Sequence, residues 1–210
     1  MENLQPSKTP RTGSRVFSAL VVGTALLAAS LTIGVSRARA AGSDHVRWDI
    51  VNVNIPITTV SPGGVAFATA SNNLRIRLTG SGTFVAPASD GISGAVTGGG
   101  TWETFNGSIS TGVGTYWVTK LASWQFANFQ APGLIDLIGE TNQRANGNAV
   151  LRIAYSDGSE GILGIGCHGP GAPDGITEGV IATKGYVTYW NAEAPLPTVN
   201  MNRTIFHVTK

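Results

Sequence analysis

The chain has 210 residues, of which 28 are glycine and only 12% are charged, against about 25% in an average soluble domain. Its 14 basic and 12 acidic residues give a formal net charge of +2. Without the basic N-terminal segment described next, 9 basic and 11 acidic residues remain, which is not a balance that attracts a phosphate backbone. Nucleic acid is therefore excluded as an expected partner.

The N-terminal segment has the three parts of a secretory signal peptide. A polar, basic stretch precedes an uncharged apolar run over 16–35, and small side chains flank a cleavage site that ends at Ala40. We predict a signal peptide over 1–40 and a single domain over 41–210, secreted or periplasmic, which meets the membrane only during export. A retained membrane anchor is the alternative, since about 20 apolar residues can span a bilayer.

Alternation of apolar and polar residues, which is typical of β-strands, recurs from the first expected strand at 46–55 onward. It is clearest at 74–78, where leucine and isoleucine alternate with arginine. Two apolar runs flank the Asp157-Gly158 pair, which predicts a β-hairpin. Further strands are expected over 185–190 and 203–208.

A repeated motif and one segment each allow more than one interpretation. The pattern G-x-G-T-aromatic occurs three times, ending at Phe84, Trp102 and Tyr116. We interpret the three copies as turn-to-strand transitions, because glycine permits the backbone of a turn or a bulge. The alternative is that the glycines open space for a ligand beside the aromatic rings. The segment 132–144 is either a buried strand with a loop or a short helix.

The number and spacing of these elements favour an all-β fold. We predict a single antiparallel β-barrel of roughly 8–10 strands, with a β-sandwich as the alternative. Glycine relieves crowding at barrel corners, and closure removes exposed strand edges, which so few charged residues are available to protect.

Common catalytic signatures are absent from the sequence. There is no G-x-S-x-G, no H-E-x-x-H and no paired C-x-x-C, so neither a nucleophile elbow nor a common zinc site is indicated, and no cofactor or metal is expected. The lone Cys167 is expected to be buried, with a reactive thiol beside His168 as the alternative. His45 and His207 come close if the terminal strands pair, without requiring a metal.

Aromatic residues are the main candidates for a ligand site. Glu103 joins them because it alternates with Trp102 and is expected to face a polar interior. The predicted ligand-binding residues are Trp102, Glu103, Trp117, Trp124, Tyr186 and Trp190.

The expected function is binding of a small apolar or sugar-like ligand, for which a small molecule or a carbohydrate is the expected partner. A structural or cell-surface interaction module without an internal site is one alternative. A barrel-type hydrolase or isomerase is another, and binding is favoured over catalysis. The sequence predicts no particular oligomeric state.

Overall fold

A computed structural model describes residues 42–54, 59–87, 91–196 and 200–210. The expected signal peptide over 1–40 lies outside these residues. Within them the regular structure consists of 14 strands and one short 3₁₀ turn, without an α-helix. The described ranges accordingly contain no helix long and apolar enough to cross a membrane.

The strands follow one another closely, and a 3₁₀ turn over Thr141–Gln143 precedes the ninth. They are β1 (Asp44–Asn54), β2 (Thr59–Pro62), β3 (Ala66–Thr69), β4 (Leu74–Leu78), β5 (Ser81–Ala86), β6 (Val96–Asn106), β7 (Ile109–Phe129), β8 (Ile135–Asp136), β9 (Arg144–Tyr155), β10 (Glu160–Cys167), β11 (Gly179–Lys184), β12 (Val187–Tyr189), β13 (Asn191–Ala192) and β14 (Arg203–Thr209).

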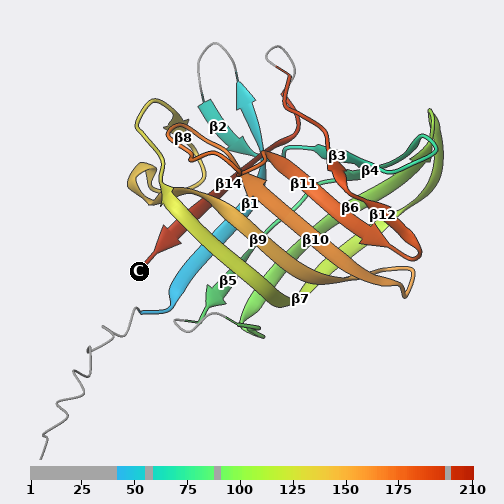
Figure 1. The fold of residues 1–210 in the computed structure, drawn as a ribbon, viewed down its shortest axis with the longest axis horizontal. Coiled ribbons are helices and arrows are strands. Elements are labelled where there is room, and N and C mark those ends of the chain that lie inside the picture. Colours follow the sequence, from blue (N-terminus) through green and yellow to red (C-terminus); the bar gives the residue numbers. More distant parts are fainter. Residues whose placement is uncertain (1–41, 55–58, 88–90, 197–199) are drawn as a thin grey trace, which may run out of the picture. The chain divides into compact units, whose positions relative to one another are not determined.

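Six of these strands close into an antiparallel barrel in the order β1-β5-β6-β7-β9-β14. β14 pairs with both β9 and β1, so the ring has no free edge. Six of the remaining strands extend the sheet outward: β10, β11 and β12 continue from β9, and β4, β3 and β13 continue from β6 (Figure 1). The other two, β2 and β8, pair with each other, and β2 also pairs with β1. The predicted all-β barrel is confirmed.

The predicted strand at 74–78 and the predicted hairpin at Asp157-Gly158 are both present in this sheet. β4 occupies 74–78, and its apolar residues Ile76 and Leu78 are fully buried. The hairpin at Asp157-Gly158 joins β9 to β10 as predicted. The segment 132–144 forms no helix beyond the 3₁₀ turn, because the Asp136 carboxylate accepts the next free backbone N–H groups and holds a turn there. The segment is therefore a loop with a two-residue strand, β8, and the expected buried strand is wrong because Ile135 is exposed.

Aromatic side chains fill the barrel interior. The Trp124 ring meets Phe84 edge-on at a centroid distance of 5.4 Å and Phe206 at 4.8 Å. Trp102 and Tyr155 form a third edge-to-face pair at 5.8 Å. The other four rings belong to one buried apolar cluster, against which the partly buried Trp124 packs, and such contacts stabilise a core beyond the burial of area alone.

The repeated glycine motif serves this packing. Its second and third copies lie inside β6 and β7 and pair with each other, so their interpretation as turn-to-strand transitions is wrong. A Cβ atom at Gly114 would lie 2.8 Å from Nε1 of Trp102, and one at Gly82 would lie 2.9 Å from Nε1 of Trp48. Glycine in one strand thus makes room for an aromatic ring of another, and the space beside these rings holds protein atoms.

Candidate functional site

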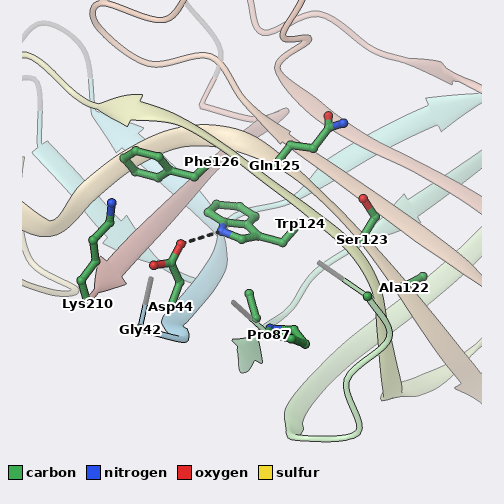
Figure 2. A pocket seen from close by; sticks show the side chains of 11 residues that line it. Gly42, Asp44, Pro87, Ala122, Ser123, Trp124, Gln125, Phe126 and Lys210 are labelled. Atoms are coloured by element: carbon green, nitrogen blue, oxygen red, sulfur yellow. Dashed lines mark hydrogen bonds between the residues drawn. The ribbon is translucent and has the colours of Figure 1, made fainter. Parts of the chain in front are cut away.

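A hollow of about 630 Å³ opens at one end of the barrel (Figure 2). The start of β1, the ends of β5 and β14, and the middle of β7 meet there. We call it the barrel-end pocket. Its lining comprises Gly42, Asp44, Ala86, Pro87, Gly91, Ala122, Ser123, Trp124, Gln125, Phe126 and Lys210.

Bulges in β7 place the aromatic wall of this pocket. The register of β7 against β9 shifts between Leu121 and Ser123, where the strand has one extra residue. An extra residue reverses the alternation of side chains, so Leu121 and Trp124 both contribute to the interior although they lie three positions apart. Trp124 and Phe126, two positions apart, then line the same pocket.

Opposite charges lie beside the aromatic rings. The indole N–H of Trp124 donates to Oδ2 of Asp44 at 3.3 Å, and Nζ of Lys210 lies 4.5 Å from the centroid of the Phe126 ring. Figure 2 shows Asp44 and Lys210 on the same side of the pocket. The pocket therefore combines flat apolar surface with donors and acceptors, which suits an amphipathic ligand.

Among the predicted ligand-binding residues, Trp124 is the one that lines this pocket. Trp102 is buried in the core, where its N–H donates to the carbonyl of Thr115 at 3.1 Å. Glu103 pairs with Arg77 across β4 and β6, with 3.4 Å between Nη1 and Oε2, and is partly exposed. The expectation that Glu103 faces a polar interior is wrong, because Trp102 takes the inward position and the interior there is apolar.

The other three predicted residues are exposed and lie apart from the barrel-end pocket. Trp117 is on the β7 surface, and Tyr186 is in the turn between β11 and β12. Trp190 follows β12 and lines a separate hollow of about 440 Å³, together with Gly164 and Ile181. The predicted residues therefore do not converge on one site.

Sequence reasoning missed Asp44 and Lys210, although a signal for them existed. β1 and β14 pair from His45 opposite Thr209 to Val51 opposite Arg203, so the outer ends of the two strands meet. Pairing of the terminal strands was expected to bring His45 and His207 together. The same pairing also brings together Asp44 and Lys210, which lie at the outer ends of these strands.

His45 and His207 lie near each other on paired strands, as expected, but they do not form a metal site. His207 lies opposite Arg47 and so close to His45 along the paired strands, and its Nε2 lies 2.9 Å from Oδ2 of Asp136. Within the described residues, His, Cys, Asp and Glu side chains form no group of three that could hold a metal ion.

The Cys167-His168 pair is not a thiol–imidazole dyad. Cys167 is buried as expected; its thiol donates to the carbonyl of Thr204 at 3.2 Å, and burial raises the pKa of the thiol. The His168 ring is directed elsewhere, with Nδ1 2.7 Å from the carbonyl oxygen of Ile176. A reactive nucleophile needs a lowered pKa and a neighbouring base, so the alternative of a reactive thiol is wrong.

Comparison of the chain with protein-family models, with curated proteins and with solved structures finds no match. Any function must therefore be inferred from the residues of the chain itself.

Proposed function

We propose that this protein is exported and binds a small sugar-like ligand in the barrel-end pocket. One observation carries the proposal: Trp124 and Phe126 share a single hollow with Asp44 and Lys210. A sugar ring has an apolar face that stacks on an aromatic ring, and its hydroxyl groups both donate and accept. The pocket volume of about 630 Å³ lies within the usual range of ~300–1,000 Å³ for small-molecule sites.

A purely apolar ligand fits these residues less well. It would cover Asp44 and Lys210 without offering either of them a hydrogen bond, and covering charged groups without partners is unfavourable. The hydroxyl groups of a sugar can instead form the hydrogen bonds that the displaced water made with these side chains. We therefore favour the sugar-like alternative over the apolar one.

The test uses the indole N–H signals of the five tryptophans in a two-dimensional NMR spectrum. Glucose, galactose and N-acetylglucosamine are titrated separately, with octanoate as the apolar comparator. We expect at least one sugar to shift the Trp124 signal, which Trp124→Phe identifies by its disappearance. Asp44→Asn should weaken that sugar at least fivefold, since its carboxylate contacts the indole N–H at the pocket.

Asp174→Asn is the matched control, because Asp174 is exposed in the loop after β10 and should leave the affinity unchanged. The proposal fails if octanoate alone shifts the Trp124 signal. It fails equally if the sugars shift only the signals of the exposed Trp117 or Trp190.

A further inference from the structure

A second pocket, of about 200 Å³, lies outside the barrel. It is bounded by the outer face of β1, β2 and β14 and by the loop after β10. Val51, Val60 and Ile205 form a small apolar cluster there, separate from the barrel interior. Val53 and Leu134 complete the apolar wall. The proposed sugar site uses none of these residues.

Glu178 lies at the polar end of this pocket. Its Oε1 accepts the backbone N–H of Thr204 at 2.7 Å, and its Oε2 accepts the backbone N–H of His168. These bonds and the charge of Arg203 favour the ionised form, but burial outweighs them and raises the pKa of Glu178 to about 7. Near neutral pH much of the population therefore carries a carboxyl proton that can be donated.

Two buried polar atoms of lining residues have no hydrogen-bond partner in the described part of the chain: Oε1 of Gln130 and Nε of Arg203. The Gln130 amide nitrogen is already engaged, donating to Sγ of Cys167 at 3.2 Å. One orphaned atom is an acceptor and the other is a donor. Buried polar groups are seldom left unpaired, so this pair indicates a missing partner.

We infer that this pocket, which we call the Glu178 pocket, binds a small neutral amide with an apolar body. The ligand carbonyl accepts from Nε–H of Arg203 and from the Glu178 carboxyl, and the ligand N–H donates to Oε1 of Gln130. Its alkyl part contacts the wall near Val60 and Ile205. The volume holds about seven water-sized groups at roughly 30 Å³ each, which is the size of isovaleramide.

Charged ligands suit the Glu178 pocket less well. Above pH 7, where Glu178 is ionised, a carboxylate brings a second negative charge beside it, and at any pH a carboxylate has no N–H for Gln130. An ammonium group brings a positive charge beside Arg203, which is permanently charged. A neutral amide supplies both a donor and an acceptor without either repulsion.

The surroundings of Glu178 make pH a useful readout. The charged and titratable neighbours are Arg203, Cys167 and His168. Arg203 stays charged, and Cys167 keeps its proton because burial raises its pKa. The His168 ring is exposed, with its Nδ1 2.7 Å from the Ile176 carbonyl oxygen. The difference between the parent protein and Glu178→Gln therefore reports the contribution of the Glu178 proton between pH 6 and pH 8.

The test titrates the full chain with isovaleramide while the methyl signals of Val60, Leu134 and Ile205 are followed by NMR. We expect these signals to shift at pH 6 and the apparent affinity to fall about tenfold at pH 8, because the protonated fraction falls from about nine tenths to about one tenth. Glu178→Gln keeps an N–H donor and should remove most of the pH dependence. Isovalerate should bind at least tenfold more weakly than isovaleramide at pH 8.

Two further variants keep the test decisive. Glu160→Gln, an exposed carboxylate at the start of β10, should preserve the tenfold pH effect. Val53→Phe fills the pocket from its partly buried edge and should abolish binding even if Glu178→Gln fails to fold. The inference is overturned if millimolar isovaleramide leaves the three methyl signals unmoved, or if isovalerate binds equally well. A tenfold pH effect that persists undiminished in Glu178→Gln overturns it too. A shift of the Trp124 indole alone would place the amide in the barrel-end pocket and would also overturn it.

Discussion

Glu178 links the pH of the solution to the stability of the fold at the scale of one residue. Its pKa is 4.5 in an unfolded chain and about 7 in the folded protein. Between these values the folded state holds one more proton than the unfolded state. Its contribution to stability is therefore complete below pH 4.5 and is lost as the pH rises to 7.

We expect urea titrations to show the free energy of unfolding falling by roughly 2–3 kcal/mol between pH 4.5 and pH 7. Glu178→Gln should flatten this decline, whereas Glu160→Gln should not. The lowered pKa values of Asp136 and Asp157 act in the opposite direction, but only as the pH falls below about 4. A stability that rises from pH 4.5 to pH 7 would contradict the assignment.

The candidate sites show which residue-scale features a sequence reveals. Trp124 could be named in advance because aromatic side chains are the usual lining of small-molecule sites. Glu178 could not, since it lies just before β11 in a loop without periodic pattern, and its burial depends on residues from β14. Asp44 and Lys210 required the pairing of strands that are more than 150 positions apart.

The strand β7 determines, at the scale of an element, which rings line the barrel-end pocket. It spans 21 residues and pairs with β6 and then β9, with three register shifts against β9. Deleting Ala122 removes the extra residue and leaves Leu121 and Trp124 two positions apart, so regular alternation should keep Trp124 and Phe126 on the inner face. Trp124 should retain its contacts with Phe84 and Phe206, and the protein should lose much less stability than the loss of about 3–5 kcal/mol that usually follows removal of a large core side chain.

Urea unfolding and the near-ultraviolet circular dichroism of the aromatic rings would measure this change. Trp124→Ala is the comparison and should show the full loss of about 3–5 kcal/mol together with a reduced aromatic signal. An equally large loss in the Ala122 deletion would show that the extra residue itself is needed to place Trp124.

Strands with regular alternation could be predicted from the sequence, and bulged strands could not. β4 and the β9–β10 hairpin follow from alternation and from the Asp157-Gly158 turn. The bulges of β7 leave no mark in composition, because any extra residue suffices to shift the register. The second and third glycine motifs resembled turns because glycine is typical of turns, although these motifs occupy the interiors of β6 and β7.

Closure of the barrel is the property of the whole molecule that holds the described strands together. β1 pairs with β14 over seven residue pairs, which brings Asp44 and Lys210 to the same pocket. The two ends of the described chain are thus neighbours, a geometry that tolerates circular permutation.

A permuted chain in which a short glycine linker joins Lys210 to Gly42, with new ends at Gly158, should therefore fold. We expect its five indole N–H signals to match those of the parent and its free energy of unfolding to stay within about 2 kcal/mol, since loop length has only a weak effect on stability. Opening the chain inside β7, after Leu121, should instead prevent folding. A permutant opened at Gly158 that lacks dispersed NMR signals would argue against closure by β1 and β14.

The fit of glycine to ring has a consequence for how this sequence can vary. A Cβ atom at Gly82 would also overlap the backbone carbonyl oxygen of Thr97, and one at Gly114 would overlap Oγ of Ser156, so a smaller ring does not by itself make room for a side chain at either position. Descendants of this protein should therefore keep both glycines even where the neighbouring ring is replaced.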